Sequence, residues 1–372
     1  MPLKALFLSA MLFAAISLSA GQSISGVELV NLQGWYAVVY PWEFLPEQSP
    51  VHPIPELFTP EQHQTPSQMA YQCRLLDQYG SAADILSLSS HPDSSDYNHW
   101  LGTYFTNCSR PFFILWEHLF SGFSLQGGFI DVNNAYNRQV FMDNLDFMFN
   151  NVIRRFGNRY VTIDGRAIIY LWASGAMVGD LAGLFDEARK KYPVAFFGSG
   201  EDFGNIERIQ AFDGFMEYSL YGFSNSGNYK AMIVNYRGHV QYQRKVLNAI
   251  YKKTGKKIYL IPTFQAAYDD TLVIPPRGNR PLYAKSRVEV IEHARLVNLD
   301  MNRWNVFDNY GPLVVWSELP EGGAVIPSLP RVENECRPDQ IQTGNTLAEL
   351  SCGYVGYGTD RLNIVARYFG RR

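Results

Sequence analysis

The chain alternates short apolar runs with longer amphipathic segments from about residue 35 to residue 316. The short runs are four to seven residues long and rich in β-branched and aromatic residues. They are apolar almost throughout, which is typical of strands buried on both faces of a parallel sheet. The predicted strands cover residues 35–40, 84–88, 111–116, 167–172, 194–198, 214–218, 257–262 and 312–316.

The longer segments between these strands have the spacing of amphipathic helices. The clearest covers residues 136–156, where apolar side chains recur on one face and polar side chains occupy the other. Similar patterns cover residues 229–253 and 284–299. Pro66 suits the first turn of an earlier helix, because proline has no backbone N–H to lose there.

Eight strands that alternate with helical or crossover segments predict an α/β fold, a single (β/α)8 barrel of the TIM type. We expect residues 21–330 to form this barrel and residues 331–372 to form a short C-terminal extension packed on it, because the alternation ends near Ser328. The alternative is a doubly wound open sheet. Its nucleotide-binding versions are weakened because no GxGxxG follows the first strand and no GxxxxGK[ST] occurs.

Residues 1–20 have the order of a signal peptide rather than of a strand or helix of the fold. Lys4 precedes an apolar run, and small residues follow it, which places cleavage near Ala20. The run is shorter than the roughly 20 residues of a membrane-spanning helix. We therefore expect a secreted, extracellular protein with no membrane span.

The four cysteines are consistent with export, because an even number in a secreted chain favours disulfides. Three pairings are possible, and the favoured one joins Cys73 to Cys108 and Cys336 to Cys352, since each bond closes a modest local loop. A net charge of −3, without a long basic or acidic block, gives no sign of nucleic acid as a partner. We expect a monomer.

Carboxylates and aromatic residues gather where the predicted strands end, and in a barrel of this kind the working residues lie there. Glu318 and Glu321 follow the last strand, and the chain contains neither G-x-S-x-G nor H-E-x-x-H. Paired carboxylates suit glycosidic cleavage, which needs an acid for the leaving oxygen and a second carboxylate. An aromatic content of 15% fits a cleft that binds sugar rings, although a large core explains it equally well.

Other strand-end residues are weaker candidates. His91 and Asp93 could contact a ligand, and His118 could orient the neighbouring Glu117. Asp269 and Asp270 together with Glu201 and Asp202 could hold a hard cation, but they lack ligand-type spacing, so we expect no metal and no cofactor. Tyr218 and Tyr221 are better candidates for sugar contacts, because each offers a ring and a hydroxyl.

The order of several short motifs resembles glycoside hydrolase family 99, the endo-α-mannosidases, and their WbsX-like relatives. The resemblance spans roughly residues 34–328 and identifies the chain as similar to a divergent member. The motifs are Tyr40-Pro41-Trp42, Asp84-Ile85-Leu86-Ser87-Leu88-Ser89, Trp116-Glu117, Gly165-Arg166, Phe212-Asp213-Gly214-Phe215, Ile261-Pro262, Asp270-Thr271 and Glu318-Leu319-Pro320-Glu321-Gly322.

The resemblance implies a retaining, endo-acting hydrolase of α-mannosides. It implies that Glu318 acts as a base on the sugar 2-hydroxyl, through an anhydrosugar intermediate, and that Glu321 acts as general acid/base. Glu117 and Tyr218 are implied to bind the sugar, with Tyr40 and Trp42 lining the site. Tyr221, Trp316 and Asp270 complete the substrate-binding residues that we predict.

The chain departs from the family pattern around the two glutamates. Ser317 stands where the family usually has asparagine, and Leu319-Pro320 stands where it usually has Trp-His. Family members also carry Ile-Glu-Pro shortly afterwards, whereas Ile326 is followed directly by Pro327 here. Two alternatives therefore remain beside an α-mannosidase: a non-catalytic glycan-binding barrel, and a glycosidase of other specificity such as an α-glucanase.

Overall fold

The computed structural model describes residues 23–40, 49, 51–60, 62–88, 95–223, 229–268, 286–303, 310–319, 323–329 and 357–371. Within these ranges the side chains at 95–99, 120, 221 and 303 are not described. The predicted signal segment and the predicted bond between Cys336 and Cys352 lie outside the described residues. In the part of the chain that is described, no helix combines the length and the apolar character needed to cross a membrane.

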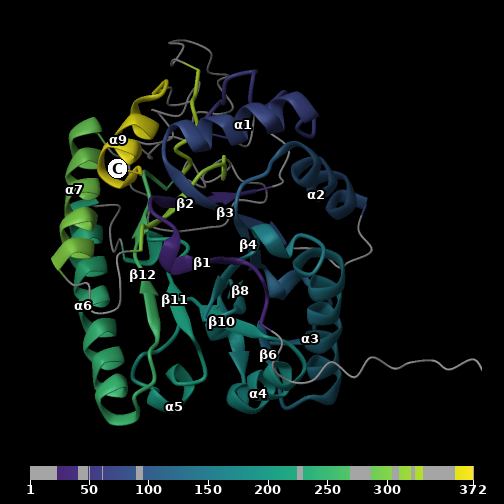
Figure 1. The fold of residues 1–372 in the computed structure, drawn as a ribbon. Helices are drawn as coiled ribbons and strands as arrows, with labels where there is room; N and C mark the ends of the chain where they lie inside the picture. Colours follow the sequence, from purple (N-terminus) through teal and green to yellow (C-terminus); the bar gives the residue numbers. More distant parts are fainter. Residues whose placement is uncertain are drawn as a thin grey trace, which may run out of the picture.

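Parallel strands form a closed barrel, seen roughly along its axis in Figure 1. The ring runs β2, β3, β4, β8, β10, β11, β12, β13, β14 and back to β2, and every hydrogen-bonded pair among these strands is parallel. Pro262 separates β12 from β13, so these two short strands are one barrel position: β12 pairs with β11 and β13 pairs with β14. The predicted (β/α)8 architecture is confirmed. The strands are β2 (Trp35–Val39), β3 (Ser81–Leu88), β4 (Phe112–Trp116), β8 (Arg166–Leu171), β10 (Val194–Gly198), β11 (Gly214–Met216), β12 (Tyr259–Ile261), β13 (Thr263–Phe264) and β14 (Leu313–Val315).

Helices surround the barrel and bury its outer face. Helix α1 begins with Pro66, as predicted, and Thr65 caps it by accepting a hydrogen bond from the backbone N–H of Gln68. The predicted helix at 136–156 is α-helical only as far as Met148 and continues as a π-helical segment over Phe149–Ile153. The helices are α1 (Pro66–Gln78), α2 (Ser95–Asn107), α3 (Ala135–Met148), α4 (Leu181–Lys191), α5 (Ile206–Ile209), α6 (Tyr229–Thr254), α7 (Arg287–Arg303) and α9 (Asp360–Phe369).

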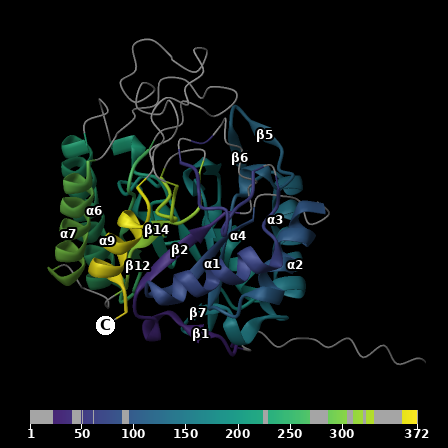
Figure 2. The same ribbon diagram turned by 90° about the horizontal axis from the view of Figure 1, so that it is seen from above.

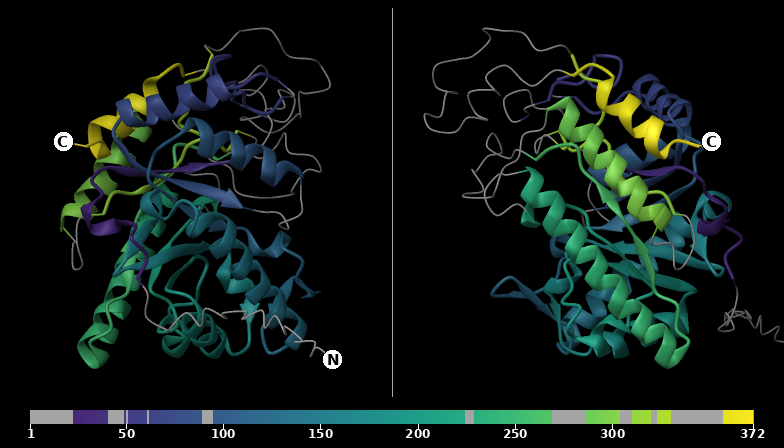
Figure 3. Two further views of the ribbon diagram at one scale, coloured as in Figure 1. Left: turned by 45° about the vertical axis from the view of Figure 1, so that its right-hand side comes forward. Right: turned by 90° about the vertical axis from the view of Figure 1, so that its left-hand side faces the viewer.

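Helix α9 takes the place of the eighth barrel helix. It lies beside α7, and the ring of its Phe369 packs against Phe264 of β13 with 5.5 Å between centroids. Its end meets the turn between α1 and β3, where a Cβ on Gly80 would lie 2.5 Å from the backbone nitrogen of Arg371. Figure 3 shows α9 next to α7 in one view and next to α1 in the other. The stretch expected as an extension therefore contains, at 357–371, the helix that completes the ring.

The amino-terminal end of the barrel is closed by the first described residues. Strand β1 (Val27–Glu28) pairs with β7 (Val161–Ile163), and the 3-10 turn Leu29–Asn31 buries Leu29 completely. Figure 2 shows β1 and β7 at one end of the molecule and β5 (Leu125–Gln126) and β6 (Phe129–Asp131) at the other. The end with β5 and β6 is the one at which the barrel strands finish.

An ion cluster at the amino end joins three strands. Asp213, directly before β11, accepts hydrogen bonds from Arg166 at 2.6 Å, from Arg189 at 2.8 Å and from the backbone N–H of Phe196 at 2.9 Å. Burial raises the pKa of Asp213, but the charges of Arg189 and Arg166 outweigh it and hold the pKa below the usual value. We call Asp213, Arg166 and Arg189 the amino-end ion cluster. It gives the Gly-Arg and Phe-Asp-Gly motifs a structural role.

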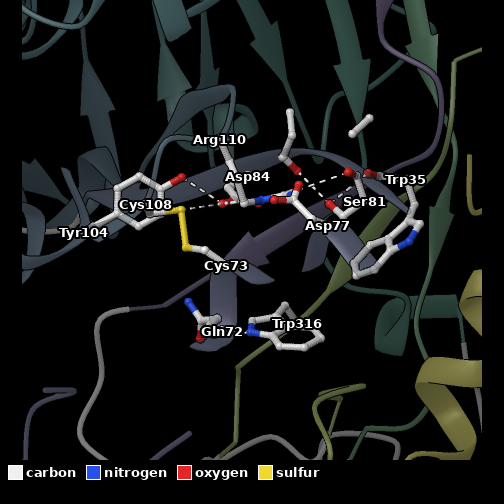
Figure 4. A network of polar contacts seen from close by, with 12 residues as sticks. Trp35, Gln72, Cys73, Asp77, Ser81, Asp84, Tyr104, Cys108, Arg110 and Trp316 are labelled. Carbon is white, nitrogen blue, oxygen red and sulfur yellow. Dashed lines mark hydrogen bonds and ion pairs between the residues drawn. A yellow bond between two sulfur atoms is a disulfide. The ribbon is translucent and has the colours of Figure 1, made fainter. Parts of the chain in front are cut away.

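Asp84 of the second-strand motif is likewise structural. Its side chain is fully buried and faces the helices, where it accepts hydrogen bonds from Arg110 at 2.9 Å and from the Tyr104 hydroxyl at 2.7 Å. The disulfide between Cys73 and Cys108 lies beside it, as Figure 4 shows. This disulfide confirms one of the two predicted pairings, and it ties α1 to the segment that leads into β4.

Candidate active site at the carboxyl ends of the strands

Two tyrosines from nearly opposite strands meet over the mouth of the barrel. Tyr40 follows β2 and Tyr218 follows β11, and their rings lie 5.9 Å apart, edge to face. Both are almost completely buried, with 3% and 6% of their surfaces exposed. The structure thus brings together two of the predicted sugar-contacting residues, from the first and sixth barrel strands.

Glu117 also lies at the carboxyl ends of the strands. It follows β4, and the Ser87 hydroxyl on β3 donates a hydrogen bond to Glu117 Oε1. The backbone N–H of Glu117 donates to the carbonyl of Leu88 at 3.0 Å, which extends the pairing of β3 with β4 by one residue. Because side chains alternate along a strand, Trp116 points to α3 and Glu117 points inward. Glu117 is 6% exposed, so its carboxylate is a buried and oriented group at the mouth.

The residue before Glu318 fastens the eighth strand to the first. Ser317 Oγ accepts a hydrogen bond of 2.9 Å from the backbone N–H of Tyr40, and Ser317 is 3% exposed. Glu318 itself is half-buried. Leu319, one of the departures from the family pattern, is 2% exposed and belongs to the main core. Ser317 and Leu319 therefore anchor the backbone on both sides of Glu318.

The chain after the two glutamates returns to the barrel. The backbone N–H of Val325 donates to the carbonyl of Val315 at 3.2 Å, and Ala324, Val325 and Ile326 are fully buried. A Cβ on Gly323 would lie 3.1 Å from Gln265 Nε2, so this glycine passes close to the seventh strand end. Glu321 lies outside the described residues, and the described residues on each side of it are held in place.

Trp316 is not brought together with these residues. Its indole is fully buried on the helix side of β14, where Nε1 donates to Gln72 Oε1 of α1 at 3.0 Å (Figure 4). Its ring packs near that of Trp35, with centroids 6.3 Å apart. The backbone of Tyr221 lies in the 3-10 turn Tyr221–Phe223, and its side chain is not described. Trp42, Asp270, His91 and Asp93 fall outside the described residues.

His118 lies directly beyond Glu117 and is fully buried. Its ring packs against Trp116 and Phe123, with centroids 6.2 and 6.5 Å away. Burial lowers the pKa of His118 to about 4, opposed in part by a hydrogen bond with the backbone of Trp116. The imidazole is therefore neutral near pH 7, and it forms part of the apolar support behind the loop that begins at Glu117.

Two of the suggested cation ligands, Glu201 and Asp202, have other partners, and Asp269 and Asp270 lie outside the described residues. Glu201 Oε1 accepts a hydrogen bond from Arg208 at 2.9 Å, and Arg208 also donates to the carbonyl of Ser174 at 2.8 Å. Asp202 accepts from the backbone N–H of Gly204 at 2.8 Å. Among the described residues, the one trio with spacing suited to a metal is Cys73, Asp84 and Cys108, and its two sulfurs are joined in the disulfide.

Several contacts between neighbouring strand ends were not predicted. Glu217 accepts hydrogen bonds from the backbone N–H of Gly200 at 3.2 Å and from Gln243 at 3.3 Å, and Gln265 Oε1 accepts from the backbone N–H of Leu220 at 2.8 Å. Ala173, just past β8, adopts a left-handed backbone with φ 48°. Non-glycine residues in this conformation are strained, and such strain clusters at functional sites. In the sequence, Glu217, Gln265 and Ala173 are marked only by their positions near strand ends, and such a position does not identify the partner of a side chain.

The same fold occurs in solved structures of glycoside hydrolases. A structure of the glycoside hydrolase family 99 endo-α-mannosidase from Bacteroides thetaiotaomicron, in complex with BIS-TRIS-propane, has a TM-score of 0.63 at 14% identity, covering 90% of this chain and 95% of that chain. A second structure of a family 99 endo-α-mannosidase from that organism gives a TM-score of 0.57 at 13% identity, covering 90% and 96%. A glycoside hydrolase-like protein gives 0.63 at 12% identity, covering 92% and 96%.

At these identities the similarity establishes the fold, and at that level it confirms the resemblance predicted from the motifs. No family model and no curated protein matches the sequence.

Proposed function

We propose that the protein is an exported, retaining, endo-acting glycoside hydrolase that cleaves α-mannosidic linkages within glycans or polysaccharides. The observation that carries the proposal is the layer at the mouth of the barrel. There the buried carboxylate of Glu117 is oriented by Ser87, and the rings of Tyr40 and Tyr218 meet next to the anchored strand end that leads into Glu318. The fold shared with endo-α-mannosidase structures supports it.

The proposed reaction uses the two glutamates in separate roles. Glu318 takes the proton from the sugar 2-hydroxyl while the 2-oxygen attacks the anomeric carbon, and Glu321 protonates the oxygen that leaves with the rest of the glycan. Water then opens the anhydrosugar as Glu321 accepts its proton and Glu318 returns a proton to the 2-oxygen. Two inversions at the anomeric carbon give net retention, and both glutamates end in their starting protonation states.

Glu117, Tyr40 and Tyr218 are proposed to bind the sugar that is cleaved. A carboxylate accepts hydrogen bonds from sugar hydroxyls, and tyrosine rings pack on the C–H faces of the sugar. The hydroxyl of Tyr218 is buried and has no hydrogen-bond partner within the described part of the chain, so a sugar hydroxyl would satisfy it.

The test is the release of oligosaccharides from α-mannan and from high-mannose glycans by the wild type, Glu318→Gln and Glu321→Gln. We expect each variant to lose about a hundredfold to ten-thousandfold in rate, because positioned acid–base groups contribute on the order of 10² to 10⁴ each. Glu56→Gln, on an exposed loop, is the matched control and keeps full activity. Circular dichroism checks that every variant is folded.

Folded Glu318→Gln and Glu321→Gln variants with unchanged activity would refute the assignment. Wild-type protein that binds α-mannan without cleaving any α-linked polysaccharide would favour the non-catalytic glycan-binding alternative. Preferential cleavage of α-glucan would favour the α-glucanase alternative, and product analysis on the two polymers separates these outcomes.

Export is part of the proposal. It is motivated by the signal-like order of residues 1–20 and supported by the disulfide between Cys73 and Cys108, since such bonds persist in oxidising compartments. N-terminal sequencing of protein secreted by an expression host tests it, and a mature end near residue 21 is the expected result.

A further inference from the structure

The segment that follows the two glutamates is held by residues near the C-terminus of the chain. The carbonyl oxygen of Ala324 accepts two hydrogen bonds, from the Tyr357 hydroxyl at 2.7 Å and from Arg361 Nη1 at 2.8 Å. Ala324 is fully buried, and Arg361 is 8% exposed with its guanidinium 4.0 Å from the centre of the Tyr357 ring. The donors are 33 and 37 residues away along the chain.

Further contacts fasten the rest of this segment. Ser328 Oγ accepts a hydrogen bond from the backbone N–H of Tyr357 at 2.9 Å, and the backbone N–H of Ser328 donates to the carbonyl of Gly358 at 3.0 Å. On the other side, the backbone N–H of Ile54 donates to the carbonyl of Pro327 at 3.1 Å. Residues 323–329 thus lie between residues 51–54 and the start of α9, and their position depends on both.

These contacts hold residues 323–329, the next described segment after Leu319. Upstream, Ser317 and Leu319 have contacts of their own, so the described residues on both sides of Glu321 are held in place. Buried carbonyls are almost always paired, and removal of a donor leaves the backbone free to move toward another partner. A shift of about 1 Å at a catalytic group costs on the order of 100-fold in rate.

We propose that Arg361 and Tyr357 are positioning residues, which hold residues 323–326, close downstream of Glu321, through the Ala324 carbonyl. The proposal rests on the proposed function for its kinetic consequence, and on the contacts alone for its structural one. It gives α9 a second role beside closing the ring of helices.

The experiment compares full-length Arg361→Met and Tyr357→Phe with Arg361→Lys and Arg367→Met. Arg367 is exposed on the same helix, so Arg367→Met removes the same charge without touching Ala324. Hydrogen exchange of the backbone amides is measured over residues 313–329, and kcat and KM are measured on α-mannan. Tyr357→Phe serves as the second variant, because it removes one hydroxyl and keeps the packing if Arg361→Met is poorly folded.

We expect Arg361→Met to speed exchange at 323–326 by about tenfold or more, with β3, β4 and β8 unchanged, because one buried hydrogen bond is lost. We expect its kcat to fall about 10- to 100-fold while KM changes less than threefold. Arg361→Lys, which still offers a donor, recovers most of the loss, and Arg367→Met matches the wild type.

Unchanged exchange at 323–326 in both Arg361→Met and Tyr357→Phe overturns the proposal. If the wild type cleaves glycans, variants with faster local exchange but an unchanged kcat also overturn it. If the wild type cleaves no glycan and the variants still show faster local exchange, the proposed hydrolase is refuted, and the role of Arg361 and Tyr357 in holding residues 323–326 is established.

Discussion

Two buried carboxylates at opposite ends of the barrel have different surroundings. Asp213, at the amino end, is held by two guanidinium groups and a backbone N–H. Glu117, at the carboxyl end, accepts a hydrogen bond from the hydroxyl of Ser87 and lies at the end of the barrel where the rings of Tyr40 and Tyr218 meet. Both carboxylates belong to motifs on which the resemblance to glycoside hydrolase family 99 was based.

The difference separates a structural carboxylate from a candidate functional one. Two arginines keep Asp213 ionised and leave little of it for a ligand, so its contribution is to the stability of the strand ends. At Glu117 a hydroxyl, that of Ser87, orients the carboxylate. Carboxylates accept hydrogen bonds from sugar hydroxyls. Motifs of similar appearance therefore have a structural role at one end of the barrel and are candidates for chemistry at the other.

The largest expected effect is on stability at the amino end. Asp213→Asn should lower the free energy of unfolding by about 3 kcal/mol, because it leaves two partly buried arginines without their anion. Chemical denaturation measures it, and activity at 25 °C of the folded variant stays near that of the wild type. Asp186→Asn is the control, since that exposed carboxylate pairs with the same Arg189 at 3.4 Å and should change stability by less than about 0.5 kcal/mol.

The amino-end ion cluster also predicts an acid limit. The pKa of Asp213 is lowered by folding from a usual value of 3.8, so its stabilisation is fully present above about pH 4. It is lost as the pH falls through the lower folded-state pKa. Asp213→Asn should remove this part of the acid sensitivity, and an identical acid profile in the two proteins would contradict the role of the cluster.

The matching change at the carboxyl end should affect activity and leave stability intact. Glu117→Gln keeps the shape and the contact with Ser87 but loses the charge, and a hydrogen bond to a charged group contributes about 1.5–3 kcal/mol. We expect kcat/KM on α-mannan to fall about 100-fold, with the midpoint of thermal unfolding within about 2 °C of the wild type. Glu187→Gln, on the outer face of α4, is the control. A loss of stability without a loss of activity would show that Glu117, like Asp213, has a structural role.

A smaller effect is expected from His118, behind Glu117. Its pKa is about 4 in the folded protein against 6.5 as the usual value, so the unfolded chain gains a proton below pH 6.5 while the folded chain does not. Stability therefore falls as the pH drops from 6.5 to 4, by about 2 kcal/mol between pH 6.5 and 5. His118→Phe should flatten this slope. Wild type and variant at pH 8 provide the reference, and equal slopes would contradict a lowered pKa of His118 in the folded protein.

The architecture and several residues of the mouth could be predicted from the sequence. Strands buried on both faces are almost wholly apolar, so the eight runs were visible, and topology places whatever follows them at one end of the barrel. Tyr40, Tyr218 and Glu117 lie at strand ends as predicted, and their roles in binding sugar remain predictions that came with the family resemblance. Glu321 and Asp270 are predictions that lie outside the described residues.

Other features depend on partners that are distant in the sequence. Arg361 and Tyr357 act on Ala324 across more than thirty residues, and no local pattern indicates it. Helix α9 follows a long stretch without alternation, so its place in the ring could not be inferred. Trp316 was expected near the sugar, but the alternation of side chains turns it toward Gln72 and turns Ser317 inward. That register follows from the strand pairing, which the sequence does not contain.

The central claim is that the carboxyl-end layer and the glutamate pair cleave α-mannosides with retention. The most direct measurement is proton NMR of the first products released from α-mannan by the wild type, recorded before mutarotation. We expect the newly formed reducing ends to appear first as the α-anomer and Glu318→Gln to abolish the signal. Release of the β-anomer, or an undiminished signal from Glu318→Gln, would contradict it.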